Sequence, residues 1–296
     1  MATFATSDQL LVVIDPVARR ADGESVRIAK DVLSAGAAHT KVCLPEGPEE
    51  FARVLGRRGS RRPVLIGDDR ALLRAVSLLH RQRELTACAL SLVPVGPALG
   101  LARALGVPTG AVAAARAVLD GAERRLDLLV DDSDGVVLGT VGIPPVPARG
   151  GHRTGGGPDG GADGGAAGPH GRPWLRTCQS LVRTLAPARP ARTALPLGGG
   201  PARLRVEVDG VVLVDLDQEV EGVSLTPGAA GVAEVEVRPL PDPAGVRRGP
   251  LTAVGRTVTV SGAHFRYRAD AVESGPVRTR TWTVLESAWG LTLPAK

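Results

Sequence analysis

Two loops of this chain carry residue types that could hold a phosphate group. The apolar run Pro63–Ile66 ends in Gly67-Asp68-Asp69-Arg70, and the apolar run Ala89–Val93 ends in Pro94-Val95-Gly96-Pro97. Each loop leads into a stretch of helix-forming composition, which predicts strand, turn and helix in succession. Glycine lets backbone N–H groups approach a phosphate closely, and the start of a helix favours an anion. The sequence therefore predicts that a phosphate would lie against these two loops.

A third loop follows the first apolar run of the chain. Residues Gln9–Ile14 are apolar after the first position and end at Asp15-Pro16. A buried parallel strand that ends in a polar loop is where doubly wound sheets place their ligands. We therefore expect Asp15 and Pro16 to line the same site. A carboxylate in that place repels a phosphate unless a cation lies between them.

Strand-like and helix-like stretches alternate through the first 126 residues. Expected strands are 9–14, 41–44, 63–66 and 89–93, and expected helices are 25–35, 48–55, 71–79, 99–105 and 111–119. This alternation predicts a parallel sheet with helices packed on its faces. We assign residues 1–126 to an N-terminal doubly wound, Rossmann-like α/β domain, and residues 127–143 to strands that cross into a second domain. A dinucleotide-binding dehydrogenase is set aside, because no Gly-x-Gly-x-x-Gly motif follows the first strand.

The composition changes abruptly after residue 143. Residues 144–173 are rich in glycine and proline, and they contain almost nothing to bury. Such a segment cannot offset the entropy lost on ordering, so we predict a disordered insert. His152 and His170 lie inside it. They could bind a metal, but two histidines so far apart in glycine-rich sequence seldom do.

The last part of the chain, residues 174–296, is predicted to be β-structure after a short amphipathic helix. The stretch Ala202–Val214 alternates apolar and polar residues, and its Asp209-Gly210 pair is typical of a hairpin turn. Further strands are expected at 232–237, 256–260, 265–268 and 280–284. Short strands joined by glycine and proline turns are typical of a β-sandwich. The expected fold class is thus an α/β domain followed by an all-β sandwich domain.

The second loop and its helix line up without a gap on a segment of a known family. Residues 94–108, Pro-Val-Gly-Pro-Ala-Leu-Gly-Leu-Ala-Arg-Ala-Leu-Gly-Val-Pro, are similar to Pro-Leu-Gly-Thr-Gly-Asn-Asp-Phe-Ala-Arg-Ala-Leu-Gly-Ile-Pro of the diacylglycerol kinase catalytic domain. Bacterial lipid kinases and sphingosine kinases share this domain, which belongs to the NAD kinase-like superfamily. Residues 67–71, Gly-Asp-Asp-Arg-Ala, resemble the nucleotide loop of that family, Gly-Gly-Asp-Gly-Thr. Residues Arg124–Val130 resemble its Gly-x-x-Arg-x-x-Asp-Leu segment.

The resemblance implies an ATP-dependent lipid kinase whose substrate lies in the cleft between the two domains. The hydroxyl of a diacylglycerol-like lipid would attack the γ-phosphate of ATP, with Mg²⁺ bridging phosphate oxygens. Asp69 would organise the Mg²⁺. The residues that would line the nucleotide are Asp15, Pro16, Gly67, Asp68, Asp69, Arg70 and Gly96.

The family also places an Asp-Gly-Glu segment in its β domain, where the carboxylates act as the base for the acceptor hydroxyl or support it. Residues Arg268–Pro276 retain Asp270 at that place, and Glu273 lies one position late. The resemblance therefore makes Asp270 and Glu273 the candidate catalytic residues. For Glu273, a surface carboxylate in a hairpin is the competing interpretation.

Several positions depart from the family motifs. Asp15 stands where the family has asparagine, Asp68 and Arg70 stand at glycine positions, and residues 97–100 replace Thr-Gly-Asn-Asp. Arg70 either reaches a phosphate as a cation or pairs with Asp68 or Asp69 at the helix start. Two functions follow: a lipid kinase, or a catalytically inactive relative that binds nucleotide or lipid as a regulatory protein.

The overall composition limits the classes of binding partner that we expect. Aromatic residues make up 2% of the 296 residues, which leaves few rings to stack on bases, so we expect no nucleic-acid partner. The net charge is +5, and the basic residues are spread among acids except in Arg57–Arg62. That run is either a solvated loop or a contact for anionic lipid or phosphate.

The same sequence bears on the compartment. The three cysteines are widely spaced and form no metal or redox pattern, which favours a reducing compartment. No signal peptide is apparent, and no apolar run reaches the roughly 18 residues that indicate a membrane span. We expect a cytoplasmic protein that meets its lipid substrate at the membrane surface. Peripheral membrane attachment and a homodimer are left open.

Overall fold

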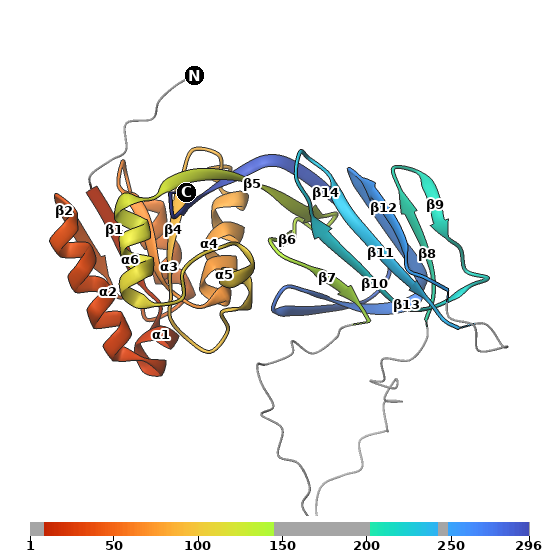
Figure 1. Ribbon diagram of the computed structural model, residues 1–296, viewed down its shortest axis with the longest axis horizontal. Coiled ribbons are helices and arrows are strands. Elements are labelled where there is room, and N and C mark those ends of the chain that lie inside the picture. Colours follow the sequence, from red (N-terminus) through yellow and green to blue (C-terminus); the bar gives the residue numbers. More distant parts are fainter. Residues whose placement is uncertain (1–8, 145–201, 242–247, 296) are drawn as a thin grey trace, which may run out of the picture. The chain divides into compact units, whose positions relative to one another are not determined.

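The computed structural model describes residues 9–144, 202–241 and 248–295 (Figure 1). The predicted glycine-rich insert lies outside the described residues apart from Pro144, as do His152, His170 and the helix expected after residue 173. All described residues belong to one compact unit. The predicted boundary between a first and a second domain therefore stays a prediction.

Four parallel strands form one part of the sheet. They are β1 (Gln9–Ile14), β2 (His39–Cys43), β3 (Arg62–Gly67) and β4 (Ala89–Pro94), in the order β2-β1-β3-β4. Every pairing among them is parallel. Three of these strands are apolar along nearly their whole length because both of their faces are covered.

Helices cover both faces of these strands (Figure 1). Residues of β1 alternate between two core clusters, as the period of a strand requires. One cluster joins β1 to α2 (Gly23–Gly36) and α6 (Ala111–Asp120). The other joins it to α3 (Pro48–Gly56) and α4 (Asp69–Arg81). Two short helices, α1 (Pro16–Ala21) and α5 (Gly100–Ala104), follow β1 and β4.

The last strand of the chain joins this parallel part to the rest of the sheet. β14 (Val272–Leu293) pairs along β13 at its start, along β5 (Ala122–Asp131) over most of its second half, and in parallel with β4 near its end. β5 runs through residues 126 and 127, where the sequence predicted a domain boundary. A single path of paired strands therefore runs from one end of the sheet to the other.

The remaining strands surround a third core cluster, which contains Tyr267 and Trp282. They are β6 (Val136–Val137), β7 (Val141–Ile143), β8 (Ala202–Val208), β9 (Val211–Val214), β10 (Glu219–Pro227), β11 (Ala233–Pro239), β12 (Leu251–Gly255) and β13 (Thr257–Ala269). The hairpin predicted at Asp209-Gly210 is confirmed, because both residues have positive φ between β8 and β9. The strands expected at 256–260 and 265–268 form one longer strand, β13.

Within the described residues, no helix combines the length and the apolar character that a membrane span requires.

Candidate functional site

The loops after β1, β3 and β4 are joined by backbone hydrogen bonds. The N–H of Val95 donates to the carbonyl oxygen of Gly67 over 2.9 Å, and the N–H of Asp69 donates to that of Ala98 over 2.8 Å. The N–H of Asp15 donates to a carbonyl oxygen of β3 over 2.9 Å. The three loops that carry the predicted nucleotide residues are therefore neighbours at the carboxyl ends of the parallel strands.

Both glycines of these loops lie where a side chain would collide. A Cβ atom at Gly67 would lie 2.6 Å from the Cβ of Ala71 and 3.2 Å from the Cβ of Asp15. Gly96 has a φ of +136°, and a Cβ there would lie 2.9 Å from the Cβ of Asp68. Glycine is thus needed at both positions for the loops to pack against each other.

Asp15 is buried and fully engaged. Its Oδ1 accepts a hydrogen bond from the N–H of Val17 over 2.7 Å, which caps α1, and Pro16 occupies the first turn of that helix. Its Oδ2 forms an ion pair with Nη1 of Arg74 over 2.7 Å. The guanidinium of Arg74 also lies over the ring of Phe51. Arg74, which we did not predict, is therefore the cation that neutralises Asp15.

Asp68 occupies the start of α4. Its Oδ1 accepts hydrogen bonds from the N–H groups of Arg70 at 3.1 Å and Ala71 at 3.3 Å. Asp68 is only 3% exposed, and its Oδ2 has no hydrogen-bond partner. Burial raises the pKa of the Asp68 carboxyl above its ordinary value; the two N–H groups oppose this rise and the charge of Asp15 adds to it. The helix start that the sequence predicted to face a phosphate thus faces a carboxylate of the protein itself.

Asp69 holds the first turn of α5. Its Oδ2 accepts a hydrogen bond from the N–H of Leu101 and its Oδ1 from that of Ala102, each over 2.9 Å. The N-cap residue of α5, Leu99, makes no side-chain capping bond. Asp69 therefore supplies, from the neighbouring loop, the cap that α5 itself lacks.

Arg70 is exposed at the protein surface. Among the described residues it makes no ion pair, so its guanidinium does not pair with Asp68 or Asp69 as one of the two interpretations expected. Its backbone N–H donates to Asp68, and its positive charge opposes the rise that burial causes in the pKa of the Asp68 carboxyl, without forming an ion pair. The other interpretation, in which Arg70 reaches a phosphate, stays a prediction.

Asp270 lies in the turn between β13 and β14, with a φ of +50°. Its Oδ2 accepts a hydrogen bond from the N–H of Leu138 over 2.8 Å. Its Oδ1 accepts from the N–H groups of Gly139 at 2.8 Å and Thr140 at 2.9 Å. Burial raises the pKa of the Asp270 carboxyl; the three N–H groups oppose the rise, and the charge of Asp69 adds to it. Asp270 thereby fixes the loop between β6 and β7.

This loop also approaches α5. A Cβ atom at Gly139 would lie 2.7 Å from Oδ1 of Asp270 and 3.0 Å from Cδ1 of Leu101. Leu101 is the residue whose N–H binds Asp69. The structure therefore brings Asp69 and Asp270 into one region, although they are far apart in the chain.

Glu273 does not join this group. It is exposed on β14, where it lies opposite Arg268 of β13 in the strand register. Its carboxylate oxygens lie 4.0 Å from Nη1 of Arg266 and 3.7 Å from Nη2 of Arg268. This geometry agrees with the interpretation as a surface carboxylate of a hairpin.

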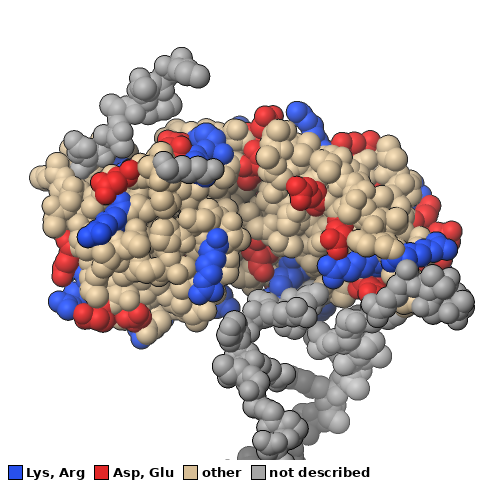
Figure 2. Space-filling model, in the orientation of Figure 1, with Lys and Arg blue, Asp and Glu red and all other residues tan. Residues whose placement is uncertain are grey.

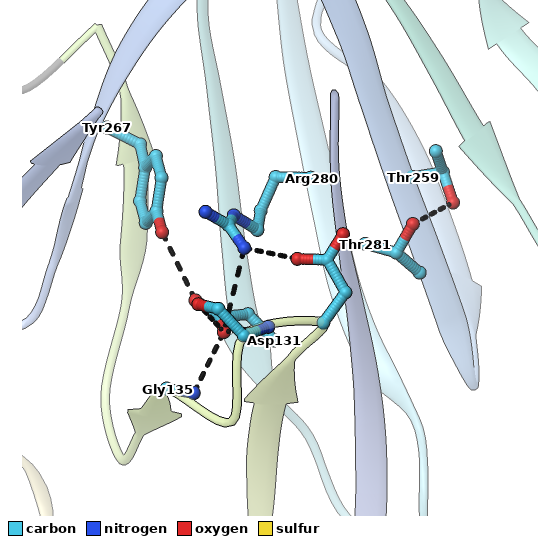
Figure 3. Close-up of polar contacts among 8 residues, drawn as sticks. Asp131, Gly135, Thr259, Tyr267, Arg280 and Thr281 are labelled. Carbon is cyan, nitrogen blue, oxygen red and sulfur yellow. Dashed lines mark hydrogen bonds and ion pairs between the residues drawn. The ribbon is translucent and has the colours of Figure 1, made fainter. Parts of the chain in front are cut away.

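A partly buried polar network around Asp131 was not predicted (Figure 3). The carboxylate of Asp131 accepts hydrogen bonds from the hydroxyl of Tyr267 at 3.1 Å and from the N–H of Gly135 at 2.8 Å. Nη1 of Arg280 lies 3.9 Å from Oδ1 of Asp131 and also pairs with Asp132. The network joins the turn between β5 and β6 to β13 and β14. It thus supports the segment that leads to the partners of Asp270.

On the face shown in Figure 2, acidic and basic side chains are interspersed, and neither kind forms a continuous patch. In the basic run 57–62, Arg58 pairs with Glu84 over 2.6 Å. Arg62 donates to the carbonyl oxygen of Val118 over 2.7 Å. These two side chains serve the fold, which favours the interpretation of this run as an ordinary loop.

The three loops as arranged do not fit a nucleotide phosphate with Mg²⁺. The N–H groups at the start of α4 already bind Asp68, and the carboxylates of Asp68 and Asp69, which form no ion pair in the described residues, would repel a phosphate. Magnesium sites in proteins use carboxylate oxygens that remain open to the ion. The described residues contain no cluster of three or more His, Cys, Asp or Glu side chains that could hold a metal.

Solved structures with this fold are known. Two structures of a putative diacylglycerol kinase from Bacillus anthracis str. Sterne each align over 98% of this chain and 98% of their own, with a TM-score of 0.66 and 12% sequence identity. A structure of a diacylglycerol kinase from the same organism aligns over the same shares with a TM-score of 0.65 and 11% identity. No protein-family profile matches the sequence, and no curated protein does. The described part of the chain therefore has the fold of these kinases.

Proposed function

We propose that this protein is a catalytically inactive relative of the diacylglycerol kinases and binds nucleotide or lipid as a regulatory protein. The observation that carries the proposal concerns Asp69, the candidate metal ligand. Both of its carboxylate oxygens accept backbone N–H groups of α5. A carboxylate used in this way is a poor Mg²⁺ ligand, and without the ion the charge that develops in phosphoryl transfer is not neutralised.

The acceptor side supports the same proposal. A general base must reach the hydroxyl from which it takes a proton. Asp270 binds three backbone N–H groups, and Glu273 lies on the surface beside two arginines. Asp270 could act as that base only by giving up bonds that fix the loop between β6 and β7, and Glu273 does not join the region of Asp69 and Asp270.

A second candidate function is an ATP-dependent lipid kinase acting on a diacylglycerol-like lipid. Two observations favour it: the fold match to diacylglycerol kinases along the chain, and the raised pKa of the Asp270 carboxyl. A raised pKa is the direction that a carboxylate base requires near neutral pH. In this alternative Asp270 would take the proton of the lipid hydroxyl.

One pair of measurements separates the two functions. Calorimetry with Mg·ATP tests nucleotide binding, and transfer of labelled phosphate to mixed diacylglycerol micelles tests turnover in the same sample. We expect no transfer. Sedimentation with diacylglycerol-containing vesicles then tests the lipid-binding role. Transfer that is lost in Asp270→Asn and kept in Glu273→Gln would overturn the proposal and establish the kinase.

A further inference from the structure

The start of α4 is a place where a protein can bind an anion. The helix has 13 residues, so the partial positive charge at its first turn is well developed. The first N–H groups of a helix have no partner within it and point outward. A carboxylate or a phosphate satisfies them equally well.

The carboxylate of Asp68 occupies the position that a bound anion would take at the start of α4. One oxygen of its carboxylate binds the N–H groups of Arg70 and Ala71, and the other is buried without a partner. An ordinary helix cap is not buried in this way. Asp22 caps α2 by accepting a hydrogen bond from the N–H of Ser25 over 3.0 Å, and it does so at the exposed surface. A buried carboxylate oxygen without a partner costs free energy, a cost that the exposed cap Asp22 does not carry.

Arg70 and Arg74 of α4 bring positive charge to the surroundings of Asp68, where Asp15 and Asp69 are the acidic neighbours. Arg70 is exposed on the first turn of α4 and makes no ion pair among the described residues. Arg74 follows one turn later and neutralises Asp15. Removing the carboxylate of Asp68 would leave the N–H of Arg70 without its partner, on the residue that also carries the exposed cation, whereas the N–H of Ala71 would keep its 3.0 Å bond to the backbone carbonyl oxygen of residue 68.

We propose that the carboxylate of Asp68 is the internal ligand of an anion site at the start of α4 and closes that site to external phosphate. The proposal rests on the proposed function and narrows it, because a regulatory protein whose phosphate site is closed would bind lipid rather than nucleotide. The ligand class of the opened site is a phosphate or polyphosphate group.

The test is calorimetry of the full-length Asp68→Gly variant with tripolyphosphate. Glycine is well accepted at a helix N-cap, so we expect this variant to fold. We expect it to bind tripolyphosphate at least about tenfold more tightly than the wild-type protein. Asp22→Gly is the matched control, since it removes a cap carboxylate from an exposed helix. It should show no gain.

Two further variants sharpen the result. Asp68→Asn keeps an oxygen on the same N–H groups and should leave the site closed, so binding as tight as in Asp68→Gly would overturn the proposal. Asp68→Ala removes both carboxylate oxygens and the charge, and it replaces Asp68→Gly if that variant does not fold. No gain in either opened variant would overturn this inference and leave the proposed function standing. Phosphate transfer by the wild-type protein would instead overturn the proposed function.

Discussion

The hydroxyl of Ser91 donates a hydrogen bond to the hydroxyl of Thr292 over 2.9 Å, across 201 positions of the chain. Ser91 lies on β4 and Thr292 near the end of β14, and both are buried. The bond lies beside the short parallel pairing of these two strands. It therefore attaches the last strand of the chain to the parallel part of the sheet. Asp270 lies just before β14, and Asp68 and Asp69 follow β3, so paired strands connect the two regions.

This contact predicts a coupling between the two ends of the chain. Ser91→Ala should lower the free energy of unfolding by about 1–2 kcal/mol, because it leaves the buried hydroxyl of Thr292 without its partner. Thr292→Val should cost a similar amount. The double variant should cost less than the sum, as measured by urea unfolding. Strict additivity would show that the two hydroxyls do not stabilise each other.

The role of Asp69 as a cap of α5 predicts a local effect. Asp69→Ala should speed hydrogen exchange at the N–H groups of Leu101 and Ala102 and lower the free energy of unfolding by about 1–3 kcal/mol. The exposed cap Asp22 is the control, and Asp22→Ala should cost about 1 kcal/mol or less. Equal losses in the two variants would argue against a special role of Asp69.

The network around Asp131 predicts a dependence of stability on pH. Burial pushes the pKa of the Asp131 carboxyl upward, but hydrogen bonds from Ser133 and Gly135 and the charge of Arg280 outweigh it, so the pKa is lowered on folding. A lowered pKa stabilises the fold above the unfolded value of about 3.9, and this stability is lost as pH falls through the folded value.

Asp131→Asn should therefore be less stable than the wild-type protein at pH 7, and the difference should shrink as the pH falls below about 4. Unfolding by urea at several pH values measures it. Ser133→Ala is the control that keeps the carboxylate, and its pH dependence should lie between those of the other two proteins. A difference that stays constant from pH 7 to low pH would contradict the assignment.

Local features of the fold could be predicted from the sequence, and long-range side-chain contacts could not. The first strand was predicted as 9–14 and observed as Gln9–Ile14, because a run of buried apolar residues is a local signal. The hairpin at Asp209-Gly210 is local as well. In contrast, Arg74 and Asp15 lie 59 positions apart, and nothing in either segment indicates that they pair.

The candidate site shows the same limit. The sequence indicated which loops carry Asp68, Asp69 and Asp270, but it did not indicate what their carboxylates bind. All three accept backbone N–H groups, and every residue type except proline offers such a group. A carboxylate that binds a ligand and one that binds a neighbouring loop therefore look alike in the sequence. Only the packing of the loops distinguishes them.

The close approach of Gly67 to Ala71 predicts a suppressor pair. Gly67→Ala places a methyl group 2.6 Å from the Cβ of Ala71, so we expect the free energy of unfolding to fall by about 1–3 kcal/mol. Gly23→Ala is the control, because a Cβ there would meet nothing within 4 Å and alanine suits a helix.

Combining Gly67→Ala with Ala71→Gly removes the methyl group that collides. The double variant should recover part of the loss, even though glycine inside α4 costs about 1 kcal/mol by itself. Thermal and urea unfolding of the single and double variants measure the recovery. If the losses of the two single variants simply add, the contact between these positions is not what requires glycine at 67, and the second neighbour, the Cβ of Asp15 at 3.2 Å, becomes the cause to test.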